Sequence, residues 1–182
     1  MIEIKRIGES NKNDINIPNE AFIIHGRMIP TYDGEYWSYT TEEYAEKSEM
    51  VFPDENYSFD EMKNEYFFVG AYDGDRCIGL AIYKHDMFKY LYLEDLKVSS
   101  EFRGHGIGKL LIAEGMKIAA EEGYIGQYTI GQDNNLSACL FYIAVGFEIG
   151  GINTRVYDGT SQSGKKDIYF YQKLTADSSS AS

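Results

Sequence analysis

The alternation of apolar and polar positions predicts a strand at the start of the chain and a helix further on. Ile2–Ile7 alternates enough to begin a strand, whereas residues 9–20 are polar and rich in asparagine, which favours a loop or a short helix. Thr40 is followed three residues later by Glu43, the spacing of a capping box, so we expect a helix from Thr40 to about Met50. The pattern between these two elements assigns no fold.

The middle of the chain predicts antiparallel strands. Tyr66–Tyr72 and Cys77–Tyr83 are strand-like runs on either side of Asp73-Gly74-Asp75, a tight-turn signal, so together they predict a β-hairpin. Tyr90–Val98 is rich in aromatic and branched residues and predicts a third strand. We therefore expect an antiparallel sheet up to this point.

The last part of the chain predicts two helices and three strands. Each apolar run at helical spacing stops at a glycine, Gly123 for the first and Gly146 for the second. The expected elements are a helix over Ile107–Ala120, a strand over Tyr124–Ile130, a helix capped by Asn134-Asn135 over about Leu136–Val145, and strands over Ile152–Tyr157 and Ile168–Leu174. Strands that precede, interleave with and follow helices predict a mixed α/β (α+β) sheet with helices on its faces.

Length and composition fit a globular protein. The chain has 182 residues, 43% hydrophobic and 25% charged, which is enough to bury a core but short for two independent domains. We expect a single domain over residues 1–174 and a disordered tail over residues 175–182, which lack an apolar anchor. Apolar runs stop short of the roughly 20 residues that a bilayer demands, so no membrane partner is expected. The first residues hold no apolar block of a secretory signal, so the expected location is the cytoplasm.

Neither the cysteines nor the histidines indicate a metal. Cys77 and Cys139 match no disulfide framework and no metal-ligand cluster, so each is expected to be a buried apolar filler. His25, His85 and His105 are scattered and show no ligand spacing. We therefore predict no metal.

Acidic residues outnumber basic ones, and most of the excess is local. The formal net charge of −12 would repel a phosphate backbone, so we expect no nucleic-acid partner. Residues 31–66 hold eleven acidic residues against two lysines. This stretch is either a solvated surface that keeps the protein soluble or a field that concentrates a cationic ligand.

A glycine-rich loop lies between the third predicted strand and the helix that follows. In Arg103-Gly104-His105-Gly106-Ile107-Gly108-Lys109 the backbone amides converge at a helix N-terminus, where the helix dipole favours an anion. A P-loop would need glycine in place of Arg103 and Ser or Thr in place of Leu110, and a dinucleotide fingerprint would need glycine in place of Lys109. The glycines therefore either let a phosphate approach in another way or only form a turn.

Two motifs in this order resemble the GCN5-related N-acetyltransferases (GNAT), which bind acetyl-coenzyme A. Arg103, Gly106 and Gly108 carry the pattern Arg-x-x-Gly-x-Gly, which resembles the pyrophosphate loop of that family. The pattern Asn-x-x-Ala-x-x-Phe-Tyr-x-x-x-Gly-Phe is carried by Asn135, Ala138, Phe141, Tyr142, Gly146 and Phe147. The resemblance covers residues 66–174 and implies the GNAT fold, a mixed, mostly antiparallel central sheet of about seven strands flanked by about four helices. It also implies acetyl-coenzyme A as the co-substrate.

A closer resemblance is to the bacterial streptothricin acetyltransferases. The segments that carry it are Val51-Phe52-Pro53-Asp54, Leu93-Glu94-Asp95-Leu96, the glycine loop and Tyr157-Asp158-Gly159-Thr160-Ser161. The Glu94-Asp95 strand also resembles the spermidine/spermine acetyltransferases. Both groups acylate polycations, which implies an enzyme that acetylates an amine of a cationic small molecule, with the β-lysine moiety of streptothricin as the leading acceptor and antibiotic resistance as the result. A polyamine acetyltransferase, a non-catalytic coenzyme A-binding sensor and a homodimer stay open.

The resemblance assigns catalytic roles to Glu94 and Tyr142. An amine must be neutral to attack a thioester, and resemblance to the polyamine enzymes favours Glu94 as the base, acting directly or through water. Adjacent strand residues point to opposite faces, so Asp95 is expected as a substrate or structural contact, although both acids could serve structural ion pairs alone. Tyr142 stands at the family's general-acid position and would protonate the departing thiolate, but a Phe-Tyr pair on a helix is also typical of core packing.

The remaining expected site residues bind rather than react. The resemblance implies that the pantetheine arm pairs with the main chain of Leu96, Lys97 and Val98, and that Asn135 bonds the cofactor arm, caps its helix, or both. The diphosphate would be held mainly by main-chain amides of the loop, with charge from its arginine or lysine. The loop residues concerned are Arg103, Gly104, His105, Gly106, Ile107, Gly108 and Lys109.

An aromatic cluster in the acidic stretch is the last candidate. Trp37 stands close in sequence to Tyr32, Tyr36 and Tyr39. Its members either flank a cationic substrate through their ring faces or pack in the core.

Overall fold

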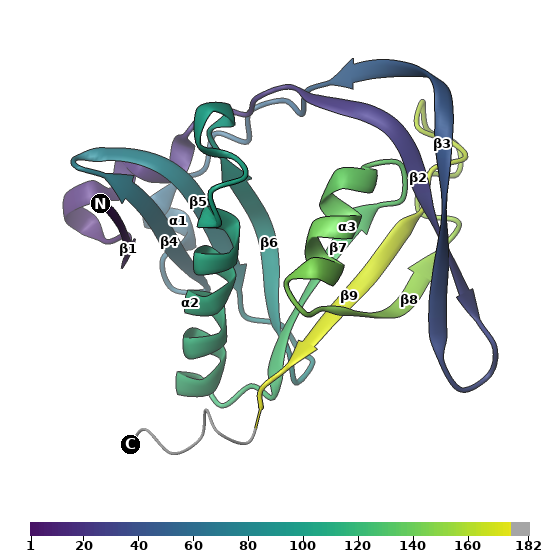
Figure 1. Ribbon diagram of the computed structural model, residues 1–182. Coiled ribbons are helices and arrows are strands. Elements are labelled where there is room, and N and C mark those ends of the chain that lie inside the picture. Colours follow the sequence, from purple (N-terminus) through teal and green to yellow (C-terminus); the bar gives the residue numbers. More distant parts are fainter. Residues whose placement is uncertain (176–182) are drawn as a thin grey trace. The chain divides into compact units, whose positions relative to one another are not determined.

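A computed structural model describes residues 1–175 (Figure 1). By their internal contacts these residues form two units, one of residues 1–20, 52–127 and 173 onward, and one of residues 21–51 and 128–172. Within residues 1–175, seven strands belong to one sheet and two others pair separately. The predicted mixed α/β class with a seven-stranded, mostly antiparallel sheet is confirmed. The predicted disordered tail falls, apart from Thr175, outside the described residues.

The first unit holds four antiparallel strands in the order β1-β4-β5-β6. The hairpin between β4 and β5 turns at Gly74, whose φ of +59° is a left-handed conformation that glycine adopts without a side-chain clash. The predicted first strand, hairpin and third strand are confirmed. The four strands are β1 (Ile2–Arg6), β4 (Tyr66–Asp73), β5 (Arg76–Lys84) and β6 (Leu91–Val98).

The helix α2 (Ile107–Glu121) packs on these strands and contacts β4, β5 and β6. A close approach is made at Gly115, where a Cβ would overlap the ring of Tyr83 in β5. The Tyr83 hydroxyl donates a hydrogen bond to the carbonyl of Leu111 over 3.2 Å. The helix ends ahead of Gly123, as predicted.

Three short helices complete the first unit. They are the 3₁₀ helices η1 (Glu9–Asn16) and η2 (Ser100–Phe102) and the α-helix α1 (Phe59–Met62). Ile15 of η1 packs with Ile7, Phe68, Leu80 and Ile82 in a buried cluster, so η1 covers part of the core. The polar stretch predicted as a loop or short helix is therefore a short helix. None of the helices in residues 1–175 is long and apolar enough to cross a membrane.

The second unit holds the strand order β7-β9-β8 and the helix α3. The side chain of Asn135 accepts a hydrogen bond from the amide of Ala138 over 3.3 Å, so the predicted cap of α3 is confirmed. The elements are β7 (Gly126–Gln132, which begins in the first unit), α3 (Leu136–Ala144), β8 (Glu148–Asn153) and β9 (Asp167–Lys173).

The strand predicted over Ile152–Tyr157 is wrong in position, because β8 begins at Glu148. Gly150 belongs to this strand and lies against the ring of Tyr171 in β9, where a Cβ would clash. Glycine has no apolar side chain, so the pattern of hydrophobic residues did not predict the first half of the strand. The last strand lies where it was predicted.

A separate antiparallel ribbon pairs β2 (Phe22–Tyr32) with β3 (Trp37–Met50). The helix predicted over Thr40–Met50 is therefore wrong. Arg27 of β2 stands opposite Glu42 of β3, and their side chains form an ion pair with Nε 2.6 Å from Oε2. The threonines and tyrosines of this stretch favour strands, and β2 supplies the backbone partners that a helix would find within itself.

The two cysteines lie in different surroundings. Cys139 is fully buried, and burial raises the pKa of its thiol to about 12, as suits a buried filler. Cys77 is only partly buried and its thiol donates to the carbonyl of Gly79 over 3.4 Å, so the same prediction is wrong for Cys77. Its position near the start of β5 leaves the side chain partly open.

Candidate active site

Glu94 lies at a bulge in β6. Ile82 of β5 pairs with Asp95 and Tyr83 pairs with Leu93, so Glu94 is an extra residue between two registered pairs. Leu93 is buried and Asp95 is largely buried, whereas Glu94 is exposed. At this bulge the Glu94 side chain is open to solvent, whereas that of Asp95 is largely buried.

The surroundings of Glu94 raise the pKa of its carboxyl group. Partial burial contributes most, and the charge of Asp95 adds to it, whereas Lys84 and a hydrogen bond from Tyr66 act in the opposite direction. A raised pKa makes a carboxylate a better proton acceptor, which is what a general base requires.

Asp95 is held in an ion pair. Its side chain is 15% exposed, and Lys97 Nζ lies 2.9 Å from Oδ2. The hydroxyl of Tyr57 donates to the same oxygen over 3.3 Å. Burial raises the pKa of Asp95 and Lys97 opposes this rise. Of the roles that the sequence left open for Asp95, these contacts support the structural one.

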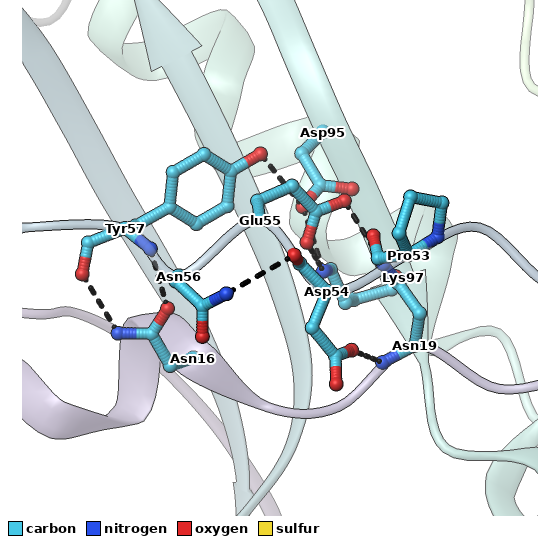
Figure 2. Close-up of polar contacts among 9 residues, drawn as sticks. All are labelled: Asn16, Asn19, Pro53, Asp54, Glu55, Asn56, Tyr57, Asp95 and Lys97. Carbon is cyan, nitrogen blue, oxygen red and sulfur yellow. Dashed lines mark hydrogen bonds and ion pairs between the residues drawn. The ribbon is translucent and has the colours of Figure 1, made fainter.

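Lys97 also contacts the segment 53–57 (Figure 2). The sequence did not predict that this segment lies on β6. Lys97 Nζ lies 2.9 Å from Glu55 Oε2. Burial lowers the pKa of Lys97, but the two carboxylate partners outweigh burial and hold the pKa above its ordinary value. Sequence reasoning missed Glu55 and Tyr57; the one available signal was the resemblance at Val51–Asp54, which ends directly before them.

Asn16 and Asn19 hold the segment 53–57 from the other side. Asn16 Nδ2 donates to the Tyr57 carbonyl over 2.8 Å, and its Oδ1 accepts from the Tyr57 amide over 2.7 Å. Asn19 Nδ2 donates to Glu55 Oε1 and to the Pro53 carbonyl, each over 2.9 Å. The segment is therefore fixed by side chains on two flanks (Figure 2).

The glycine loop leads into the N-terminus of α2. Gly104 and Gly106 both have a φ of +79°, which favours glycine, and no atom lies within 4 Å of a Cβ placed on either. Gly106 is the N-cap of the helix, so the first helical amides, from Ile107 to Lys109, find no partner inside the helix. A 15-residue helix thus begins with amides that have no partner inside the helix and with its positive end at this loop, an arrangement that suits a diphosphate.

Arg103 and His105 brace this loop. Arg103 Nε donates to the Val98 carbonyl over 3.0 Å, and its guanidinium lies 3.7 Å from Glu20. His105 Nδ1 lies 3.0 Å from the Arg103 carbonyl and 3.2 Å from the Phe102 carbonyl. Arg103 therefore links the loop to the end of β6, and Nδ1 of His105 points at the backbone of the loop.

Residues 96–98, expected to pair with the pantetheine arm, continue β6 toward the loop. They pair with residues 79–81 of β5 in regular register, with Leu96 opposite Ala81 and Val98 opposite Gly79. One edge of β6 is thereby fixed by β5, next to the loop that follows.

In the second unit, Asn135 lies where β2 meets the start of α3. It forms a parallel bridge with Gly26, where a Cβ would overlap the Glu42 carbonyl. His25 Nε2 lies 3.0 Å from Ser137 Oγ in the first turn of α3. The ribbon therefore fixes the residue that is expected to bond the cofactor arm.

Tyr142 packs in an aromatic cluster. The residue is 9% exposed, and its ring centroid lies 5.6 Å from those of Phe141 and Phe147 and 5.3 Å from that of Phe170. The packing role that the sequence left as an alternative therefore applies to the ring. The general-acid role belongs to the hydroxyl and stays a prediction.

The aromatic cluster around Trp37 does not lie in the core. Tyr32, Tyr36 and Tyr39 are 53%, 68% and 38% exposed, and the rings of Tyr32 and Trp37 lie 5.0 Å apart. The core alternative is wrong for these tyrosines, because they stand at the turn that joins β2 to β3. Their exposure leaves the cation-binding alternative open.

The histidines have separate partners. His85 Nδ1 lies 2.8 Å from the Tyr124 hydroxyl, and the other two histidines contact the residues already described. Within residues 1–175, no group of three His, Cys, Asp or Glu side chains could hold a metal ion.

Comparisons with known proteins agree on one family. The model of the Acetyltransferase (GNAT) family matches residues 31–147. Streptothricin acetyltransferase A of Bacillus subtilis (strain 168) is 30% identical over 175 residues, which cover 94% of this chain and 99% of that protein. Streptothricin acetyltransferase of Streptomyces lavendulae is 31% identical over 101 residues, 56% of this chain and 53% of that protein. A crystal structure from Bacillus anthracis str. Ames, assigned as a streptothricin acetyltransferase in complex with acetyl coenzyme A, has a TM-score of 0.85 and 28% identity over 96% of this chain and 99% of its own.

Proposed function

The chain belongs to the acetyltransferase (GNAT) family, and from that premise we propose that it transfers the acetyl group of acetyl-coenzyme A to an amine of a cationic small molecule, the β-lysine moiety of a streptothricin-type antibiotic. The observation that carries the proposal is the likeness to the Bacillus subtilis streptothricin acetyltransferase, which extends over 94% of this chain and 99% of that protein.

The glycine loop fits the diphosphate of acetyl-coenzyme A. Left-handed Gly104 and Gly106 leave open space at the N-terminus of α2, and a side chain there would occupy the approach to the amides. Arg103, braced on Val98, adds a positive charge at the loop. Acetyl-coenzyme A, when bound, supplies the activated acetyl group, and the loop holds its charged end.

The strand β6 would hold the other part of the co-substrate. Residues 96–98 are fixed by β5 along one edge. The pantetheine arm would pair with the main chain of Leu96, Lys97 and Val98 as an added strand does. A main-chain amide directed at the thioester oxygen would stabilise the oxyanion that forms there. Asn135, which caps α3, would bond the arm with the remaining polar atoms of its side chain.

Glu94 and Tyr142 would move the protons of the reaction. The amine nitrogen attacks the thioester carbonyl, so that a C–N bond forms and the C–S bond breaks. Glu94, with its raised pKa and open carboxylate, takes the proton that the amine loses. Tyr142 gives its hydroxyl proton to the departing thiolate and regains one from solvent.

The charge of the protein suits a cationic acceptor. Residues 31–66 hold eleven acids against two lysines, and the exposed tyrosines near Trp37 lie in the same stretch. Acetylation removes one positive charge from the acceptor, which weakens its attraction to any polyanion. Loss of that attraction would inactivate an antibiotic that acts through its positive charge.

The test is a thiol-release assay with acetyl-coenzyme A and fresh streptothricin. We expect free coenzyme A to appear together with an antibiotic heavier by one acetyl group, and bacteria that express the chain to survive the drug. Glu94→Gln is the matched variant and should slow both the release of coenzyme A and the formation of the acetylated antibiotic. Thiol release no faster than in the absence of antibiotic would reject streptothricin as the acceptor.

A polyamine acceptor is the second candidate, because the Glu94-Asp95 pair also resembles the spermidine/spermine enzymes and the acidic stretch would attract a polyamine equally. Competition decides between them. If spermidine is acetylated with a higher kcat/KM than streptothricin, the polyamine assignment replaces the antibiotic one.

A further inference from the structure

The ammonium group of Lys97 is enclosed by two carboxylates and a ring. Its Nζ lies 2.9 Å from Asp95 Oδ2 and 2.9 Å from Glu55 Oε2, and 5.9 Å from the centroid of the Tyr57 ring. The side chain of Lys97 is only 12% exposed, and those of Asp95 and Glu55 are 15% and 31% exposed. Asp95, Glu55 and Tyr57 are called the ammonium cage below.

The cage has the chemistry of a site for a primary ammonium. Charge-assisted hydrogen bonds to carboxylates are among the strongest that proteins make, and an aromatic face adds attraction for a cation. Two carboxylates carry more negative charge than one ammonium neutralises, so the cage favours a bound cation. In this chain the occupant is a side chain of the protein itself.

The walls of the cage do not depend on Lys97 alone. Asn19 holds Glu55 and Asn16 holds the backbone of Tyr57, while the Tyr57 hydroxyl donates to Asp95 (Figure 2). Removal of the lysine side chain should therefore leave its two acids close together, and a small cation could relieve their repulsion.

The cage and the proposed base share neighbouring residues of β6. Asp95 follows Glu94 directly, with Cα atoms about 3.8 Å apart, although the Glu94 side chain is exposed and that of Asp95 is largely buried. Burial raises the pKa of Tyr57, and the charges of Asp95, Glu55 and Glu94 raise it further, so the cage and the base share one electrostatic environment. The charged groups that act on Glu94 are Lys84 and Asp95, and Tyr66 forms a hydrogen bond with it.

We propose that Lys97 is a specificity-determining residue: it fills the ammonium cage with the chain's own ammonium and so closes the cage to a second ammonium group of the acceptor. This inference rests on the proposed function, in which the acceptor amine reacts at Glu94. A linear diamine that presents one amine at Glu94 gains nothing from the cage in the native chain. Without Lys97, its second ammonium would find two carboxylates and a ring.

The first experiment tests the cage without any acetyl transfer. Lys97→Ala removes the atoms of n-propylammonium from the cage, so we add n-propylammonium chloride and measure Tm against sodium chloride at equal ionic strength. We expect Tm of Lys97→Ala to rise by about 3–5 °C with n-propylammonium. Lys97→Met, which fills the same space without charge, should show no such rise.

The outcomes of this arm are distinct. An equal response of Lys97→Ala and Lys97→Met would overturn the proposal, since the cation would then act elsewhere. The double variant Glu55→Gln, Lys97→Ala lacks one wall charge and should respond less than Lys97→Ala. If Lys97→Ala folds only when n-propylammonium is present, this result supports the proposal as a rise in Tm would.

The second experiment measures specificity. The ratio of kcat/KM for 1,5-diaminopentane to kcat/KM for n-pentylamine should be about tenfold higher in Lys97→Ala than in the native chain. It should stay within about twofold of native in Lys97→Met and Lys97→Arg, and fall back in Glu55→Gln, Lys97→Ala. An unchanged ratio in Lys97→Ala would overturn the proposal. If no amine is acetylated by any variant, the proposed function fails, whereas the Tm measurement still decides the cage.

Discussion

Glu94 is exposed and lies at an irregularity of β6. It is the extra residue between the pairs Ile82–Asp95 and Tyr83–Leu93. Asp95, one residue further, is bound by Lys97 and Tyr57. Adjacent acids therefore have different surroundings, which suits one for proton transfer and the other for structure.

Glu94→Gln tests the base. Because burial and Asp95 raise the pKa of Glu94, native activity should fall as the pH drops through that raised value and the carboxylate becomes protonated. The variant lacks this acid limb. Its kcat/KM should be lower by about 100-fold at pH values where Glu94 is ionised but few acceptor amines are neutral. The deficit should be smaller at high pH, where the amine needs no base, and below the pKa of Glu94, where the native chain loses its base as well. The measurement is the pH profile of kcat/KM.

The control for this prediction is Glu122→Gln at the end of α2, an exposed acid away from β6, which should keep the native profile. Equal activity of Glu94→Gln and the native chain at every pH would assign the base to solvent.

Tyr142→Phe separates the two roles of the tyrosine. The ring contacts with Phe147 and Phe170 remain, so the free energy of unfolding should change by less than about 1 kcal/mol. Loss of the hydroxyl should lower kcat by about 100-fold while the Kd of acetyl-coenzyme A stays within about twofold. Tyr171→Phe, whose ring stacks on Tyr128 in the same unit, is the control. An unchanged kcat would remove Tyr142 from the chemistry.

At the scale of elements, the sequence predicted those features that depend on residues close together in the chain. The turn at Gly74, the glycine stop after α2 and the Asn135 cap of α3 each act within a few residues, and all were predicted. The strand β3 depends instead on a partner strand whose paired residues are about five to thirty positions away, and its Thr-x-x-Glu spacing indicated a helix. Pairing between distant segments is not contained in a local pattern.

The candidate site divides in the same way. The glycine loop and the residues of the α3 motif were found because motif spacing is local. The contact of Lys97 with Glu55 joins residues 42 positions apart, and nothing in the pattern of residues 53–57 indicates that they lie on β6. The ammonium cage therefore required the structure.

Gly115→Ala tests the packing of α2 on β5. Alanine is favoured over glycine within a helix by about 1 kcal/mol, so propensity alone predicts stabilisation. A Cβ at this position would instead overlap the Tyr83 ring, and we expect the free energy of unfolding to fall by about 1–3 kcal/mol. Urea denaturation measures it.

The matched control is Ala113→Gly, an exposed position in the same helix, which should cost about 1 kcal/mol from propensity alone. A Gly115→Ala protein as stable as the native one would show that α2 can move away from Tyr83 without cost.

At the scale of the whole molecule, the charge distribution makes an acceptor-dependent prediction. The net charge is −12, and eleven acids against two lysines in residues 31–66 concentrate it, with Glu43, Glu46 and Glu49 exposed on β3. Such a field raises the rate at which a polycation arrives, and salt screens it over about 8–10 Å at physiological strength.

We therefore expect kcat/KM for a polycationic acceptor to fall by about tenfold between low and high salt, and kcat at saturation to change little, because the field acts on encounter and not on the bound complex. A monoamine of the same reactivity should lose less, since its attraction to the field is weaker. Replacing Glu43, Glu46 and Glu49 together by glutamine should flatten the salt dependence for the polycation. Equal salt slopes for polycation and monoamine would mean that the acidic stretch only keeps the surface solvated, and the acceptor would then be selected by contacts at β6 alone.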